Sequence, residues 1–423
     1  MNEDVIAAGE RERVRHSVFA RLADLDLAAA VSALVATPSP NPPGHESDVA
    51  RMLTSLVQRW GLVAEADPVA EGRDNVRVSI RPRDDDEDKG RGLDVLFVGH
   101  LDTVPADPAN WTVDPFGGTV ADGAVWGRGS VDMKGGLAAM AAALSAVAAV
   151  APERARRVDL LAVVGEEVDC RGSRAAVAAG NLPPVGMLVV GEPTDLRVVI
   201  AHKGALRLEI AVRGRAAHGA RPELGANAVT AAARVIAACD AATLPTGASH
   251  PLLGPATMSI NTVEGGSAIN VVPDSCRVTL DIRTLPGDDH VAIRQAVEDT
   301  VQRTLQRVPG VSARVGVLNE VDAVSTDLDD PAVAAARRAA RHAWESDPGE
   351  PNDAPFSPVG VAFFSDASVL QPALAAPTVL FGPGATTLMH QDDEHVRIDD
   401  LYRAARFYAA LILGTDPPTA PTG

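Results

Sequence analysis

Val95-Leu-Phe-Val-Gly-His-Leu-Asp-Thr-Val-Pro105 is the stretch on which the interpretation of the whole chain depends. Its apolar beginning predicts a buried strand, and that strand ends in Gly99-His-Leu-Asp102. His100 and Asp102 are two residues apart, so their side chains point to the same side of an extended backbone. Open α/β sheets place their chemistry at the carboxyl ends of such strands. Alone, however, the pair is more typical of a hydrogen-bonded structural histidine.

Two further apolar runs end in a similar way. Val158–Val164 leads into Gly165-Glu-Glu167, and Met187–Val190 leads into Gly191-Glu-Pro-Thr194. Carboxylates at the ends of buried strands are costly to bury unless they are paired or bound to metal. Their repetition therefore favours a functional site over a packing role.

The composition is that of a globular protein large enough for two domains. The chain has 423 residues, of which 46% are hydrophobic and 22% charged. Aromatic residues make up only 3%, so the core must consist mainly of small aliphatic side chains. The formal charge of -18 argues against nucleic acid and anionic membranes as partners. An anionic substrate would have to be met by locally placed arginine, lysine or metal.

Several features predict a cytoplasmic protein. Cys170, Cys239 and Cys276 are an odd number without metal-ligand spacing, which is typical of reduced thiols. The first residues have neither the basic nor the apolar region of a secretory signal. The longest Ala/Val-rich segment, Leu137–Val150, is too short to cross a bilayer.

The hydrophobic pattern divides the chain into two kinds of structure. Residues 1–200 and 323–423 combine helical periodicity with apolar strands, which predicts an α/β domain with a mainly parallel sheet flanked by helices. Residues 201–322 alternate polar and apolar positions in the order β-α-β-β-α-β, typical of a ferredoxin-like α+β unit. We therefore expect a catalytic domain interrupted by a smaller one. The charged run Arg81–Arg91 is interpreted as a solvated turn.

Six side chains suited to metal binding or proton transfer lie at strand ends or in loops: His100, Asp132, Glu166, Glu167, Glu192 and His390. Two histidines and several carboxylates at one sheet edge suit two divalent ions, typically zinc. A bridging carboxylate would hold such ions roughly 3.5–4 Å apart, and a water between them would lose its proton near neutral pH. Adjacent glutamates can divide the work, one binding metal and the other moving a proton.

Five segments, in order along nearly the whole chain, resemble the di-zinc aminoacylase/carboxypeptidase family. They are Gly99–Val104, Gly127–Gly136, Gly165–Glu167, Gly191–Thr194 and Gly382–Glu394. The family includes acetylornithine deacetylase and succinyl-diaminopimelate desuccinylase. The resemblance implies the same reaction class and the same two-domain fold, with the inserted domain serving as lid and dimerisation domain.

The resemblance also implies the metal ligands. His100 and Glu192 would hold one zinc ion. Glu167 and His390 would hold the other, and Asp132 would bridge the two. Cobalt or manganese could replace zinc, because carboxylate-rich sites accept several divalent ions.

Other roles follow from the same resemblance. Glu166 would be the general base and then the general acid for a metal-bound hydroxide, and Asp102 would orient His100. A cis peptide bond is expected between Asp132 and Met133.

The inserted domain carries three further candidates. His218 would reach the active site of the partner subunit in a homodimer and stabilise the oxyanion, although a surface histidine is the alternative. Asn270 and Arg283 would clamp a substrate carboxylate, which suits the planar fork of arginine; a purely structural role is the alternative for each.

The expected activity is removal of an acetyl or succinyl group from an N-acyl amino acid, in the manner of acetylornithine deacetylase. Phe363–Asp366 and Thr378–Gly384 resemble that branch most. A dipeptidase or carboxypeptidase acting on short peptides is the first alternative, and a non-catalytic metal-binding scaffold is the second. Asp366 would meet a substrate amine or cap a helix, and His395 is given no role.

Overall fold

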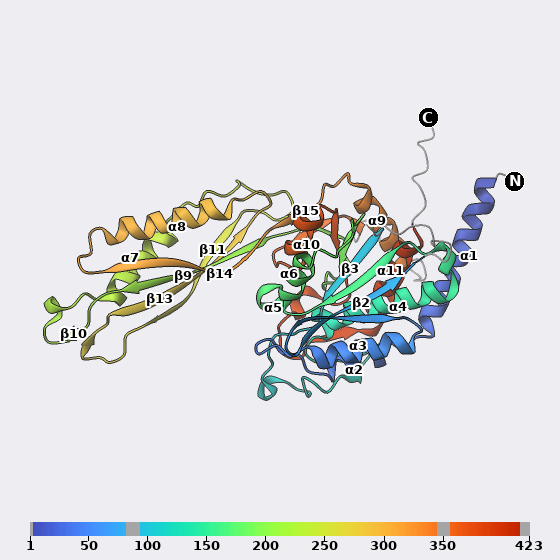
Figure 1. Ribbon diagram of the computed structural model, residues 1–423, viewed down its shortest axis with the longest axis horizontal. Coiled ribbons are helices and arrows are strands. Elements are labelled where there is room, and N and C mark those ends of the chain that lie inside the picture. The colour runs from blue at the N-terminus through green and yellow to red at the C-terminus, as the bar shows by residue number, and fades with distance from the viewer. Residues whose placement is uncertain (1–2, 82–93, 345–355, 415–423) are drawn as a thin grey trace. The chain divides into compact units, whose positions relative to one another are not determined.

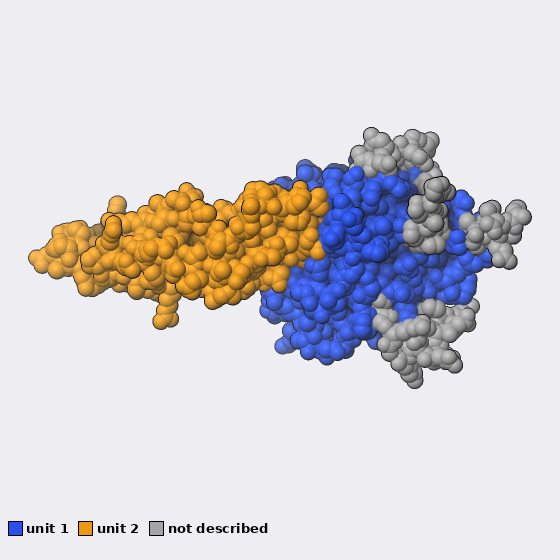
Figure 2. Space-filling model, turned by 90° about the horizontal axis from the view of Figure 1, so that it is seen from above, with its two compact units in different colours: residues 1–200, 326–359, 365–423 blue, residues 201–325, 360–364 orange. Residues whose placement is uncertain are grey.

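The computed structural model describes residues 3–81, 94–344 and 356–414, which form two compact units. Unit 1 comprises Met1–Ile200, Thr326–Val359 and Ser365–Gly423, and unit 2 comprises Ala201–Ser325 and Gly360–Phe364 (Figure 2). The expected inserted domain ended at residue 322; unit 2 extends to Ser325 and takes in a second short segment. The charged run predicted to be a turn lies almost wholly outside the described residues.

A nine-stranded sheet has the order β1-β2-β6-β3-β7-β17-β8-β15, with β16 pairing to β8. Unit 1 holds all of this sheet except β15 and the last residues of β8 and β16, which belong to unit 2. Strands β2 and β3 are labelled in Figure 1. The strands are β1 (Ala64–Ala70), β2 (Arg73–Ile80), β3 (Val95–His100), β6 (Val158–Val163), β7 (Leu188–Val190), β8 (Val199–His202), β15 (Val324–Ser325), β16 (Val359–Val361) and β17 (Thr378–Leu380). Strands β6, β3, β7 and β17 run parallel at its centre, and antiparallel pairs lie outside them. All residues of β3 and β6 are buried, as expected where helices cover both faces.

The helices of unit 1 form two groups. In the first group, helix α4 (Gly135–Val150) contacts β3 and β6. The helices that pack against α4 are α1 (Glu3–Ala23), α2 (Leu27–Val35), α3 (Ser47–Arg59) and α11 (Ile398–Leu413). Helix α9 (Pro331–Trp344) packs against α11. The second group is α5 (Glu166–Asp169), α6 (Arg171–Ala178) and α10 (Ala367–Leu374), and it contacts β1, β6 and β7. This arrangement confirms the predicted α/β architecture.

The Ala-rich helix α4 is the centre of the hydrophobic core of unit 1. Its residues from Gly135 to Val147 are all buried, because small side chains let neighbouring elements approach closely. The Ala/Val-rich segment Leu137–Val150 was expected to be too short to cross a membrane, and this was wrong for the helix as a whole. Together with the kinked turn before it, α4 forms a helical stretch, Ser130–Val150, that is long and apolar enough to do so. Because 83% of its most apolar window is buried inside the protein, it has the character of a core helix.

The N-terminal helical region of unit 1 is two helices, α1 and α2. It is broken where the side chain of Asp26 accepts the backbone N–H of Ala29 and starts α2. A three-stranded sheet in the order β18-β5-β4 was not predicted; its strands are β4 (Thr119–Ala121), β5 (Ala124–Trp126) and β18 (His395–Arg397).

Unit 2 is a four-stranded antiparallel sheet in the order β11-β13-β9-β14, covered by two helices. Its elements are β9 (Gly204–Arg213), α7 (Ala228–Asp240), β11 (Thr257–Gly265), β13 (Ser275–Thr284), α8 (His290–Leu305) and β14 (Ser312–Val321), together with the short pair β10 (Ala217–His218) and β12 (Val271–Val272). Their sequence and strand order confirm the ferredoxin-like prediction. Leu208, Val235, Leu280 and Val297 belong to a core separate from that of unit 1.

Candidate metal centre

The polar side chains that follow the central strands of unit 1 lie together. His100 is the last residue of β3, Glu167 lies in the first turn of α5 after β6, and Glu192 lies just after β7. Because β3, β6 and β7 are parallel neighbours, their carboxyl ends meet at one sheet edge. Asp132 comes from the turn before α4, and His390 from the loop before β18.

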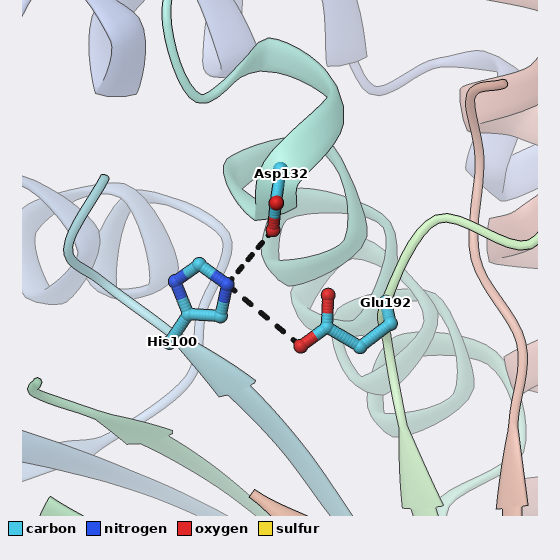
Figure 3. Close-up of side chains that lie close together, drawn as sticks. All are labelled: His100, Asp132 and Glu192. Atoms are coloured by element: carbon cyan, nitrogen blue, oxygen red, sulfur yellow. Dashed lines mark hydrogen bonds and ion pairs between the residues drawn. The ribbon is translucent and has the colours of Figure 1, made fainter. Parts of the chain in front are cut away.

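Asp132 lies between the two histidines. Its Oδ1 is 2.9 Å from Nε2 of His100, and that nitrogen is also 3.8 Å from Oε1 of Glu192 (Figure 3). Its Oδ2 is 3.3 Å from Nε2 of His390, which in turn lies 3.0 Å from Oε2 of Glu167. The side chains thus form two groups of potential ligands that share one carboxylate: His100, Asp132 and Glu192, and Asp132, Glu167 and His390.

The residues of both groups suit divalent cations. Burial would lower the pKa of His100, but its hydrogen bond to Asp132 and the nearby Glu192 raise that pKa well above the usual value. Hydrogen bonds to Asp132 and Glu167 raise the pKa of His390 to about 10. Each imidazole therefore keeps a proton on the nitrogen that faces the carboxylates. A bound metal ion would put positive charge at the same place. Oε1 of Glu167 is buried and has no hydrogen-bond partner among the described residues, so it can accept a ligand.

Glu166 is buried beside these groups but belongs to neither. Its backbone N–H, with those of Gly165 and Glu167, is held by the carboxylate of Asp102 at 2.9–3.3 Å. Burial raises the pKa of the Glu166 carboxyl well above its usual value, and the charges of nearby acids add to this effect. A carboxyl group in such surroundings is suited to exchanging a proton with a reacting group.

Asp102 contacts His100 differently from the sequence expectation. Nδ1 of His100 is 2.9 Å from the backbone carbonyl of Asp102 and 3.7 Å from its carboxylate oxygen Oδ1. The backbone carbonyl of Asp102 is therefore the closer partner of the imidazole ring. The carboxylate of Asp102 instead accepts the backbone N–H groups of the loop that carries Glu166, and it also accepts a hydrogen bond from Nδ2 of Asn41 at 2.8 Å. The cis peptide expected between Asp132 and Met133 is present.

Three nearby residues were not assigned these contacts from the sequence. Asp366 precedes α10 without capping it; instead its carboxylate is buried and accepts the hydroxyl of Ser173 at 2.7 Å. Asn41 holds Asp102, and the buried Glu394 contacts the backbone that carries Asp132. Neither of these two follows a buried strand, so the strand-end signal that indicated the other acids could not find them.

The candidates of unit 2 lie in two places. His218 is exposed, and the backbone N–H of the next residue, Gly219, donates to the carbonyl of Asn270, which brings these two residues together. Arg283 lies apart on β13, where its Nε is 2.7 Å from Oδ1 of Asp281 and its guanidinium lies over the ring of Phe364.

The chain matches known proteins over most of its length. Residues 96–414 match the model of peptidase family M20/M25/M40. The chain is 32% identical to an acetylornithine deacetylase of Myxococcus xanthus over 75% of this chain and 79% of that protein. It is 28% identical to a probable succinyl-diaminopimelate desuccinylase of Staphylococcus epidermidis, over 84% and 89% of the two chains. The structure of an M20 family metallo-carboxypeptidase of Sulfolobus solfataricus superposes with a TM-score of 0.72 at 17% identity, covering 92% and 99%.

The family match and these relatives identify a metal-dependent hydrolase of linear amide bonds, built from an α/β domain and a ferredoxin-like domain. The chain belongs to peptidase family M20/M25/M40.

Proposed function

We propose that this protein is a di-zinc amidohydrolase that removes an acetyl or succinyl group from an N-acyl amino acid. The observation that carries the proposal is the placement of Asp132, which presents one carboxylate oxygen to His100 and the other to His390. A carboxylate with a histidine on each side is suited to joining two cations. The deacetylase and desuccinylase relatives support the choice of substrate class.

In this proposal His100 and Glu192 would hold one ion, Glu167 and His390 would hold the other, and Asp132 would contribute to both groups. When bound, the ions supply a Lewis acid that polarises the amide carbonyl and makes the attacking water more acidic. Cobalt or manganese would fit the same oxygen and nitrogen donors.

The protein side chains provide the proton transfers. Glu166, fixed by Asp102 through its backbone, takes a proton from the attacking water and delivers it to the leaving amine nitrogen. His218 stabilises the oxyanion from the partner subunit of a homodimer formed through unit 2. Asn270 and Arg283 bind the substrate carboxylate, for which Arg283 exchanges its pairing with Asp281. We place the enzyme in the cytoplasm, with no nucleic acid or membrane partner.

A substrate panel tests the proposal. Full-length protein loaded with zinc or cobalt is assayed with N-acetyl amino acids, N-succinyl amino acids and dipeptides. We expect kcat/KM for the best acyl amino acid to exceed that for any dipeptide. The reverse order would make the protein a peptidase, as its metallo-carboxypeptidase neighbour is named. No hydrolysis of any compound by metal-loaded protein would identify a metal-binding scaffold.

The role of Glu166 is tested separately. Glu166→Gln is expected to keep both metal ions but lower kcat by a factor of about 10²–10⁴, because it removes the group that moves the proton. Glu153→Gln, an exposed residue of unit 1, is the control and should leave kcat unchanged. A Glu166→Gln variant that binds two ions and keeps most of its activity would refute the assignment.

A further inference from the structure

Glu394 is a fully buried carboxylate that contacts the segment carrying Asp132. Its Oε1 accepts the backbone N–H groups of Gly129, Val131 and Asp132 at 3.1, 2.8 and 3.0 Å. Its Oε2 accepts a hydrogen bond from Nη1 of Arg128 at 2.6 Å, so all four hydrogen bonds of the carboxylate come from residues 128–132. Hydrogen bonds to an ionised acceptor are shorter and stronger than neutral ones, and a carboxylate with four donors is held in one orientation.

The segment held by Glu394 runs into the helical turn Ser130–Lys134, which is kinked at Asp132 and Met133. Gly129 has a positive φ of 86°, and Asp132 departs from helical geometry with φ −118° and ψ 94°. The backbone N–H of Asp132 is therefore not bonded as in a helix; it donates to Glu394. Asp132 is fixed at two points, through its backbone by Glu394 and through its side chain by the two histidines.

Glu394 also ends the loop that presents His390. The backbone of His390 has a positive φ of 61°, and four residues later the carbonyl of Glu394 accepts the N–H of Gly127 at 2.8 Å. Between them Asp393 accepts the backbone N–H and the hydroxyl of Thr112 at 2.8 and 2.9 Å. The loop is thus tied to the same part of unit 1 that carries Asp132.

The two groups of potential ligands are supported differently. His100 and Glu192 follow strands β3 and β7, so the central sheet sets their positions. Asp132 and His390 come from segments outside that sheet, and the distance of 3.3 Å between Oδ2 and Nε2 depends on contacts between these segments. Glu394 is bonded to one segment and belongs to the other.

We propose that Glu394 is a positioning residue that sets Asp132 and His390 against each other and so forms the group Asp132, Glu167 and His390. It touches neither the substrate nor a cation. The inference rests on the proposed function only in taking this group as a metal site. It assigns a role to Glu394, which lies in the segment Gly382–Glu394 of the family resemblance but was given no task there.

The test is a metal titration of metal-free, full-length protein, followed by calorimetry with Zn²⁺ and by the visible absorption of Co²⁺. Wild type should bind two ions in two steps. In Glu394→Gln the weaker step should lose a factor of about 10–100 in affinity, as is typical when a residue that orients a ligand is changed. The tighter step should change less, because the sheet sets His100 and Glu192 and only the shared Asp132 is affected. Wild-type affinity in both steps would overturn the proposal.

Glu394→Gln also leaves the buried Arg128 without its counter-charge, so folding must be separated from positioning. The double variant Arg128→Met/Glu394→Gln removes both charges, and circular dichroism in EDTA reports its folding. The weaker step should stay weak in this variant; recovery of wild-type affinity would show that charge balance alone matters and would overturn the proposal.

Asp159→Asn provides the matched control. Asp159 is also a buried carboxylate, held by Ser79 at 2.7 Å and paired with Arg81 at 2.8 Å, but it lies near the start of β6, at the other end of that strand from Glu166. The Asp159→Asn variant should be less stable than wild type and should keep both metal-binding steps.

The metal titration also separates this proposal from the proposed function. If wild type binds two ions yet hydrolyses no acyl amino acid, the proposed function fails while the role of Glu394 stands. Binding of a single ion by wild type would overturn both.

Discussion

Asp102 accepts the backbone N–H of Glu166 through Oδ1 at 3.1 Å, and its two oxygens also accept the N–H groups of Gly165 and Glu167. One carboxylate at the end of β3 therefore holds three consecutive residues at the end of β6. These residues include both the proposed proton carrier and a proposed metal ligand. The position of Glu166 depends on Asp102 although their side chains have separate tasks.

Asp102→Asn should lower kcat by a factor of about 10–100 and change KM little, because the amide keeps the size of the side chain but turns an N–H group toward backbone donors. The measurement is steady-state kinetics with the best substrate of the panel at saturating metal. Asn41→Ala removes a single donor to Asp102 and should have a smaller effect. A kcat that is unchanged in Asp102→Asn would show that the loop holds its shape without this carboxylate.

Gly136→Ala should weaken the site through packing. Gly136 lies in the first turn of α4, and a Cβ there would overlap the backbone carbonyl oxygen of Gly191, next to Glu192. Overpacking of this kind costs about 1–3 kcal/mol. We therefore expect lower stability in urea and weaker metal binding. Gly9→Ala is the control: no atom lies within 4 Å of its Cβ, and it should stabilise α1 slightly. Metal affinity equal to that of wild type in Gly136→Ala would contradict the argument.

The sequence predicted the strand-end residues of the site better than the rest. His100, Glu167 and Glu192 follow apolar runs that are recognisable by their composition, and a parallel sheet must bring such ends together. His390 follows no strand; it was a candidate by residue type, and its place as a ligand of the second ion came from the family resemblance. The two-unit fold was predictable because the hydrophobic period changes near residue 200. The end of unit 2 was not, since Gly360–Phe364 joins it from far along the chain.

The contacts of Asp102, Asp366 and Glu394 could not be predicted from the sequence. In each case a carboxylate bonds to a partner at least 60 residues away. For Asp102 and Glu394 the partners include backbone N–H groups. Every residue except proline has such a group, so neither residue type nor spacing indicates which ones a carboxylate will bind. The short sheet of β4, β5 and β18 was missed for a similar reason: three-residue strands have too few positions to show a period of two.

Removal of metal should destabilise unit 1. Asp132, Glu166 and Glu192 are buried acids that lie close together, and bound cations offset the cost of burying their charges. A ligand present at 100 times its Kd adds about 2.7 kcal/mol to stability. EDTA should lower the unfolding temperature by several degrees, and zinc should restore it. Hydrogen exchange should place the loss of protection in unit 1. An unfolding temperature that is independent of metal would argue against a metal centre.

Stability should also fall in acid because of His202, the last residue of β8. It is fully buried, and burial lowers the pKa of its imidazole to about 4, while Nδ1 bonds to the carbonyl of Lys203 at 3.0 Å. In the unfolded chain the pKa is about 6.5. Between these values the unfolded state binds a proton that the folded state does not. Lowering the pH through this window therefore favours unfolding.

His202→Asn measures this contribution, because the amide keeps a hydrogen-bond donor but does not titrate. Between pH 7 and pH 5 the free energy of unfolding of wild type should fall by about 2 kcal/mol more than that of the variant. Urea unfolding of both proteins in EDTA checks this difference, since the carboxylates of the metal centre titrate alike in the two and cancel. An equal loss in both proteins would mean that His202 accepts its proton in the folded state, in which case its burial does not limit stability in acid.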